Sequence, residues 1–429
     1  MPSRSSSILQ MSLAGVLAIT ISAAAAAQTA APAPAVTTAQ TTTPTGPATT
    51  AVTATATTPD QPAALAPLTT PSVTGPLQWL PPAMFDAGPL GKIAANGIVT
   101  GFGMVQSNHV PGDDDGQASL SNGQIFIQKA DGKFQYFIQA GAYTLPSLGT
   151  PFLAADKTVS NFYGPLPVAF AKVPVGKTTQ FLIGSLPTLI GAEYTFTFQN
   201  MNIERGLLWN QEPAVSRGIQ VNQTLGKYLS ASFSWNDGYY SNRYSWLSGS
   251  LTYTKGPHAL AFVAGGNLGQ TGYQTAATPV QNNSSIYNVI YTFTKGAWIV
   301  QPYYQYSNVP TNLAVGVVKG ASTNGGAVLI SRAFKHGFSL PARVEYIATS
   351  GSSADGAVNL LFGPGSAGTS ITGTPTFQYG GFFFRGDISY THASSYAPGS
   401  VFGGSGSDSD QVRGIAEVGF IFGHNITEK

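Results

Sequence analysis

In the stretch "QKADGKFQYFIQAGAY", residues 128–143, apolar and polar side chains alternate on either side of an Asp-Gly turn, which indicates a β-hairpin. Phe134, Tyr136 and Ile138 fall on one face of the predicted hairpin, with Gln135 and Gln139 on the other. Phe137 and Tyr143 depart from the pattern. In a membrane barrel the apolar face of such a strand contacts lipid, and the polar face lines the interior. We predict that residues 128–143 form such a membrane hairpin, with the apolar face toward lipid and the glutamines toward the interior.

The composition of the chain favours a membrane protein over a soluble one. Only 9% of the 429 residues are charged, while there are 50 Gly, 19 Tyr and 24 Phe. A soluble surface carries many more interspersed charges. The net charge is +2 without a basic run, which argues against a nucleic-acid partner. The absence of cysteine excludes disulfides, thiolate metal sites and a cysteine nucleophile.

The first 75 residues are predicted to lie outside the folded domain. Arg4, an apolar run over 11–21 and a small-residue site ending at Ala27 indicate a signal peptide over residues 1–27. A retained membrane anchor is the alternative, although the apolar run is shorter than the ~20 residues of a spanning helix. Residues 28–75 are almost entirely Ala, Thr and Pro, which predicts a disordered or extended linker. The barrel is then expected over residues 76–429.

The rest of the chain predicts an all-β fold, a transmembrane antiparallel β-barrel of about sixteen strands. Tight turns such as Asp131-Gly132 and Lys295-Gly296 alternate with long loops rich in Gly, Ser, Asn and Thr. Counts of fourteen or eighteen strands are the alternatives. The predicted strands are 94–107, 119–129, 133–143, 165–174, 177–186, 217–226, 228–237, 245–255, 257–267, 284–294, 297–307, 325–335, 338–349, 366–379, 381–391 and 410–422. An interior of this width is expected to hold an aqueous channel.

Charged residues within the predicted strands are expected to face the interior. An Arg or Lys that faces lipid at mid-bilayer costs about 2–4 kcal/mol. The predicted interior charges are Arg332, Arg343, Glu345, Arg385, Asp387, Arg413 and Glu417.

The third long loop, at about 187–216, contains the densest group of charges of both signs. A long loop with apolar residues is expected to pack against something, and in a wide barrel the interior offers that place. We therefore predict that this loop narrows the channel, so that its charges influence solute selectivity. An external surface loop is the alternative. The predicted constriction residues are Glu193, Glu204, Arg205, Glu212 and Arg217.

The block "FLIGSLPTLIGAEYTFTFQNMNIERGLLWNQEPAVSRG", residues 181–218, and the strands after it resemble the putative beta-barrel porin-2 family of Gram-negative bacteria. The resemblance extends over roughly residues 80–422, including "SLPARVEYIATS" and "FFFRGDISYTHA". It implies a channel in the outer membrane of a Gram-negative bacterium. The matching positions are Gly191, Glu193, Asn200 or Asn202, Arg205, Pro213, Gly218 and Asp237-Gly238.

No catalytic motif, metal-ligand spacing or cofactor-binding motif is apparent, so no catalytic residue, metal or cofactor is predicted. "PGDDDGQ", residues 111–117, lacks the rest of a calcium loop and is interpreted as a solvated tip. The leading hypothesis is a porin for passive diffusion of small hydrophilic solutes or ions, in contact with outer-membrane lipid. A homo-oligomer is left open. The alternatives are an adhesion or binding barrel with a closed lumen and, less favoured, an outer-membrane hydrolase.

Overall fold

The computed structural model describes residues 75–272, 274–275 and 279–423. The predicted signal peptide and nearly all of the predicted linker lie outside these residues, so both stay predictions. No helix in the described part of the chain is long and apolar enough to cross a membrane. The strands are β1 (Ala83–Asp86), β2 (Lys92–Gln106), β3 (Gly116–Lys129), β4 (Gln135–Tyr143), β5 (Val168–Val175), β6 (Thr179–Pro187), β7 (Val215–Thr224), β8 (Leu229–Asn236), β9 (Trp246–Lys255), β10 (His258–Asn267), β11 (Ser285–Lys295), β12 (Trp298–Val309), β13 (Ala321–Ala333), β14 (Phe338–Thr349), β15 (Ala367–Gly373), β16 (Thr376–Tyr379), β17 (Phe382–Ser394) and β18 (Asp410–Phe422).

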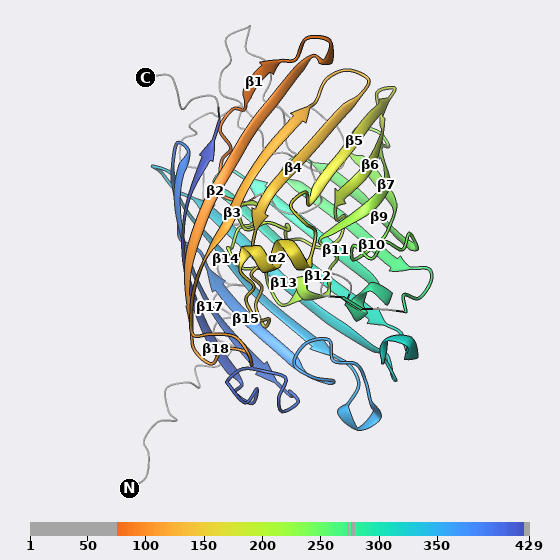
Figure 1. The fold of residues 1–429 in the computed structure, drawn as a ribbon, viewed down its shortest axis with the longest axis vertical. Helices are drawn as coiled ribbons and strands as arrows, with labels where there is room; N and C mark the ends of the chain where they lie inside the picture. Colours follow the sequence, from red (N-terminus) through yellow and green to blue (C-terminus); the bar gives the residue numbers. More distant parts are fainter. Residues whose placement is uncertain (1–74, 273, 276–278, 424–429) are drawn as a thin grey trace. The chain divides into compact units, whose positions relative to one another are not determined.

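These strands form one closed antiparallel barrel (Figure 1). Each strand pairs with its sequence neighbours, and β18 pairs with β2 to close the sheet. β15 and β16 occupy one position, because both pair with β14 and β17. β1 pairs only with the first residues of β2. Eighteen named strands less one for each of these two cases give sixteen barrel strands, which confirms the predicted fold.

Each of the sixteen predicted ranges overlaps one barrel strand, and short turns alternate with eight long loops as predicted. β1 was not predicted, and of the short helices only the one before Pro213 was, since residues 202–211 were expected to form a short helix there. The short helices are η1 (Gly88–Leu90), α2 (Ala155–Asn161), η2 (Thr197–Gln199), η3 (Leu208–Gln211), η4 (Val280–Asn283), η5 (Leu313–Val315) and η6 (Ser353–Asp355). α2 packs on β3 and β4 within the second long loop, residues 144–167.

The two faces of the sheet are arranged as in a membrane barrel, with apolar residues outside and polar residues inside. On β8, Phe233 and Trp235 are exposed, whereas Ser232 and Ser234 are buried. The same alternation places Gln305 inside and Tyr304 outside on β12. Because the exposed positions are the large apolar ones, the outer surface suits lipid, and many inward strand positions are polar.

The hairpin of β3 and β4 shows the same alternation of outward apolar and inward polar residues, and the structure explains why Phe137 and Tyr143 depart from it. Ile138 lies on the outward face, and Gln139 is buried inside, where its Nε2 donates to Gln124 Oε1 at 2.6 Å. Phe137 and Tyr143 also point inward. The Phe137 ring stacks on Phe170 at 5.6 Å, and the Tyr143 ring meets Phe196 of the third long loop at 5.2 Å. Aromatic side chains replace polar ones here because a second layer of chain fills the interior.

One predicted interior charge is wrong. On β13 the buried positions are odd-numbered, from Ala321 to Ser331, so Arg332 falls on the outward face and is exposed. Its guanidinium lies over the rings of Trp298 and Phe334, at 5.0 and 4.9 Å. Arg332 avoids the cost of a charge in lipid because it is the penultimate residue of its strand, where the side chain reaches the membrane interface.

Candidate functional site: the third long loop

The third long loop, residues 188–214 and hereafter L3, lies inside the barrel between β6 and β7. Its apolar residues Ile190, Phe196, Ile203 and Leu207 are at most 1% exposed. Gln305 on β12 donates to Leu208 O at 2.9 Å, and Gly191 N donates to Asn288 Oδ1 on β11 at 3.3 Å. An external loop would expose these apolar side chains, so burying them inside favours the inward path.

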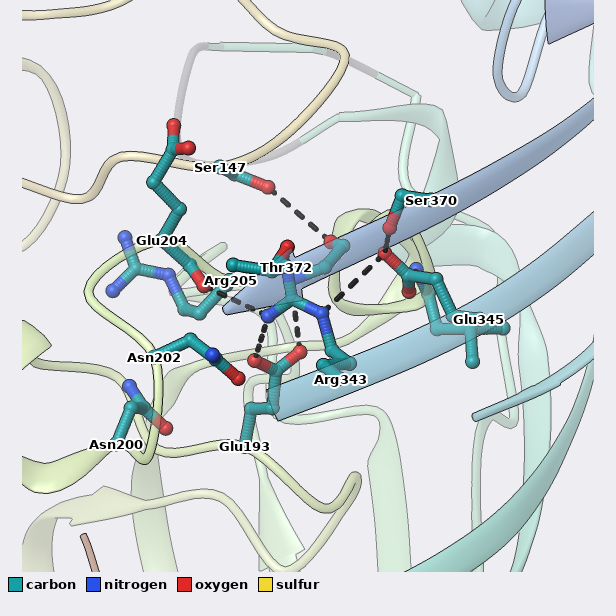
Figure 2. A network of polar contacts seen from close by, with 12 residues as sticks. Ser147, Glu193, Asn200, Asn202, Glu204, Arg205, Arg343, Glu345, Ser370 and Thr372 are labelled. Atoms are coloured by element: carbon teal, nitrogen blue, oxygen red, sulfur yellow. Dashed lines mark hydrogen bonds and ion pairs between the residues drawn. The ribbon is translucent and has the colours of Figure 1, made fainter. Parts of the chain in front are cut away.

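Arg343 of β14 makes one set of contacts that hold L3 (Figure 2). Its Nη1 lies 2.6 Å from Glu193 Oε1 and donates to Glu204 O at 2.8 Å. Its Nε lies 3.6 Å from Glu345 Oε1. Glu345 accepts in turn from the backbone N–H groups of Leu207 and Leu208, at 2.8 and 3.2 Å. Two wall residues thus bind both the side chains and the backbone of L3.

Arg413 of β18 forms the second set of contacts with the same loop. Its Nη1 lies 2.6 Å from Glu204 Oε1, and its Nε donates to Gln106 Oε1 at 2.9 Å. Glu204 Oε2 accepts from Ser389 Oγ at 3.2 Å. The backbone N–H of Glu204 donates to Asp387 Oδ2 at 2.9 Å. In Figure 2 the Glu204 carboxylate points away from Arg343, which leaves it free for Arg413.

Arg385 and Glu417, from β17 and β18, form the third set. Arg385 Nε donates to Glu417 Oε2 at 2.8 Å. Its terminal nitrogens donate to Asn200 O and Thr197 O in L3, at 3.2 and 3.1 Å. Glu417 Oε1 accepts from Ser121 Oγ at 2.8 Å. All six wall charges predicted to face the interior, other than Arg332, therefore do so and contact L3 directly or through one another.

Arg205 connects L3 to the second long loop. Leu148 N donates to Arg205 O at 3.0 Å, and Arg205 N donates to Pro146 O at 3.2 Å. The guanidinium is fully buried over the Trp209 ring at 4.5 Å, and its Nη1 donates to Thr195 O at 2.6 Å. Its Nε and Nη2 have no hydrogen-bond partner among the described residues.

Glu212 is also buried, but it stands apart from the arginines. Neither of its carboxylate oxygens has a hydrogen-bond partner in the described part of the chain. Burial raises the pKa of the Glu212 carboxyl well above its usual range, and the Glu193 and Glu345 carboxylates raise it further. Gly191 makes this position possible, because a Cβ there would lie 1.7 Å from Glu212 Oε2.

Arg217 does not join the L3 residues, contrary to prediction. It lies in β7 on the same face as the exposed Ile219. Its Nε pairs with Asp237 Oδ2 at 2.8 Å, and its guanidinium stacks on Tyr240 at 3.9 Å. The Pro213 break ends the loop two residues before β7, so Arg217 follows the alternation of the strand and not the path of the loop.

The L3 charges are closed off from solvent. Glu193, Glu204, Arg205, Arg343, Arg385 and Arg413 are each at most 2% exposed. Inward-facing polar residues on the opposite arc, β5 to β12, remain partly exposed where the strands approach the short turns. These are Lys172, Gln180, Asn222, Ser230 and Thr292.

Sequence reasoning missed Lys172. It lies on β5 with Phe170 and Val168, which are buried, and it pairs in register with the inward Leu182. It points inward and stays partly exposed. The parity of Phe170 within the predicted strand 165–174 was the signal that could have identified it.

No group of three or more His, Asp or Glu side chains in the described ranges is arranged to hold a metal ion. The acidic tip at 111–117 is occupied by the protein's own groups. Asp113 Oδ2 accepts from Gln106 Nε2 and from Phe152 N, both at 3.0 Å.

Comparisons with known proteins agree with this architecture. An anion-selective porin from Comamonas acidovorans matches with a TM-score of 0.52 at 11% identity, over 77% of this chain and 99% of that one. The outer-membrane channel DcaP of Acinetobacter baumannii matches with a TM-score of 0.52 at 9% identity, over 77% and 97%. OmpF of Salmonella typhi, solved with daunomycin, gives 0.52 at 13% identity, over 77% and 98%.

At these identities the likeness establishes the fold alone. No curated protein sequence matches the chain. The model of the family described as "Putative beta-barrel porin-2, OmpL-like" matches residues 92–422, which is more than half of the chain and spans β2 to β18. The sheet of this chain carries apolar side chains outside and polar ones inside, and its third long loop lies in the interior. The chain belongs to this family of porin-type β-barrels of the Gram-negative outer membrane.

Proposed function

We propose that the protein is a non-enzymatic outer-membrane porin through which small hydrophilic solutes and ions diffuse passively. The observation that carries the proposal is the asymmetry of the interior. L3 is bonded to β14, β17 and β18 through ion pairs and hydrogen bonds, and to β11 and β12 through one hydrogen bond each. The arc from β5 to β12 keeps partly exposed polar side chains near the short turns. Porin-type relatives in fold and in family support the same function.

In this proposal L3 narrows the pathway through its position. Its buried charges anchor the loop to β14, β17 and β18, and the solute passes along the partly exposed polar residues of the arc from β5 to β12. Glu193, Glu204 and Arg205 then affect selectivity through the placement of the loop and the potential that they create. Outer-membrane lipid is the proposed partner of the apolar outer face.

The test is single-channel recording of the full mature chain in a planar bilayer. Discrete steps that rise with salt concentration are expected. Arg413→Met should enlarge the steps or make them noisier, because L3 loses its ion pair to β18. Arg332→Met, on the outer face, is the matched control and should keep wild-type steps. A correctly folded barrel without steps would overturn the proposal.

A binding barrel with a closed lumen is the second candidate. The near-complete burial of the L3 charges favours it, because those side chains contact no solvent. The same recording separates the two functions: a closed barrel gives no steps in wild type and gains them only when L3 is released.

A further inference from the structure

The segment 75–80, which precedes β1, enters the barrel interior. Leu77 is only 8% exposed and packs in a cluster with the inward residues Ile98, Phe126 and Phe383. The Trp79 ring meets the rings of Phe126 and Phe198 edge-on, at 5.1 and 5.4 Å. Phe126 belongs to the wall and Phe198 to L3, so Trp79 fills the space between them.

Hydrogen bonds fix the segment at both ends. Gly75 N donates to Gln199 O in L3 at 2.8 Å. Gln78 and Gln378 of β16 bond reciprocally, with Gln78 N donating to Oε1 and Gln378 Nε2 donating to Gln78 O, both at 2.7 Å. A Cβ on Gly75 would lie 2.7 Å from Asn200 O. The contact with L3 is therefore tight enough to require glycine.

The segment packs on L3 and on the inner faces of β2, β3, β17 and β18, in a cluster that extends to β5 and β6 through Phe170 and Leu182. Beneath it the inward residues Ile98, Phe126, Phe383 and Ile421 are at most 5% exposed. On the opposite arc, Asn222, Ser230 and Thr292 remain partly exposed at comparable distances from the short turns. The difference matches the position of the segment.

We propose that residues 75–80 are a positioning segment that seals one side of the lumen beneath L3 and confines the solute pathway to the arc from β7 to β12. This inference rests on the proposed channel function. The seal acts through two parts: Trp79 excludes water between wall and loop, and Gly75 ties the segment to the L3 backbone that Arg385 also holds.

The absence of cysteine from the chain makes thiol labelling a direct test. Single substitutions Ile98→Cys, beneath the segment, and Ser230→Cys, on the opposite arc, are made in the full chain. A membrane-impermeant methanethiosulfonate reagent should modify Cys at 230 quickly and Cys at 98 slowly. Adding Trp79→Ala should accelerate modification at 98 at least about tenfold, because loss of the aromatic contacts raises the population of the open segment.

A second variant and a control keep the test decisive. Gly75→Val should also accelerate labelling at 98, since its side chain clashes with L3 while Trp79 stays intact. Trp298→Ala removes an outward Trp and should leave the rate unchanged. Equal labelling of the two cysteines in the otherwise unchanged chain, or no acceleration by either Trp79→Ala or Gly75→Val in folded barrels, would overturn the seal.

Conductance separates this inference from the function on which it rests. Conductance steps in the wild type that become larger in Trp79→Ala support both the channel and the seal. Steps that Trp79→Ala does not change contradict the seal alone. An absence of steps together with protected labelling at 98 contradicts the channel while the seal stands.

Discussion

Replacing Arg413 by Met removes the guanidinium that neutralises Glu204 while keeping a long apolar side chain. Arg413 and Glu204 are each almost completely buried, and 2.6 Å separates Nη1 from Oε1. After the substitution the Glu204 carboxylate keeps the Ser389 hydroxyl but has no cation in contact with it. A buried charge left in this way destabilises a protein by about 3–5 kcal/mol, and we expect a loss of that order.

A double-mutant cycle with Glu204→Gln isolates the pair. Glutamine keeps the shape of the side chain and the contact with Ser389, and it leaves no negative charge when Arg413 is absent. The double variant should therefore lose less than the two single losses added together, with a coupling energy of about 1–3 kcal/mol. Arg332→Met is the control, because an exposed cation stacked on aromatic rings contributes only about 0.5–1 kcal/mol.

The measurement is the free energy of unfolding in urea, followed by tryptophan fluorescence of the barrel in lipid vesicles. A parallel protease digestion reports whether L3 becomes accessible. If Arg413→Met lost no more than Arg332→Met, or if the two changes in the cycle were simply additive, the network would not hold L3 and the reasoning would be refuted.

Three further predictions concern single residues. The pKa of Glu212 is raised in the folded state, so the unfolded chain ionises first, at pH above about 4.3. The free energy of unfolding should therefore fall as pH rises above this value. In Glu212→Gln, unfolding measured at several pH values should lack this fall. Lys172→Gln should lower the ratio of anion to cation permeability, measured as a reversal potential in a salt gradient, by up to about fivefold, since a unit charge ~4 Å from an ion in water contributes about 1 kcal/mol. Gly191→Ala should destabilise L3 by at least about 1–3 kcal/mol, seen as faster proteolysis, because its φ is +88° and the new Cβ would meet Glu212. An unchanged digestion rate would contradict it.

The strands could be predicted from the sequence because two independent signals agree. Alternation in stretches such as 228–237 fixes which face is apolar, and turns such as Asp131-Gly132 fix where the chain reverses. The same alternation correctly placed Arg343, Arg385, Asp387, Arg413 and Glu417 inside. It failed at Arg332, since the strand end allows a charge to face outward without entering lipid.

The site was less predictable because its partners come from distant parts of the chain. That Glu193 and Glu204 would meet Arg343 and Arg413 depends on the curvature of the closed barrel, which no local pattern contains. The composition changes at Leu77, which placed residues 76–80 with the barrel, but nothing in the sequence predicted that segment 75–80 enters the interior. Leu77 and Trp79 stand at the edge of an Ala/Thr/Pro-rich tract, and only the space beneath L3 explains their burial.

The separation of the paired residues along the chain sets an order of assembly. Arg343 binds Glu193 across 150 residues, and Arg413 binds Glu204 across 209. Arg413 and Glu417 belong to β18, the strand whose pairing with β2 closes the barrel. L3 is synthesised before β14, β17 and β18, and its last anchoring contacts arise only when the final strand docks. Contacts so distant in sequence form slowly. Burial of these charges therefore indicates that the barrel has closed. In a barrel whose last strand has not paired with β2, L3 lacks its contacts with β18, and its Glu204 carboxylate is accessible to water.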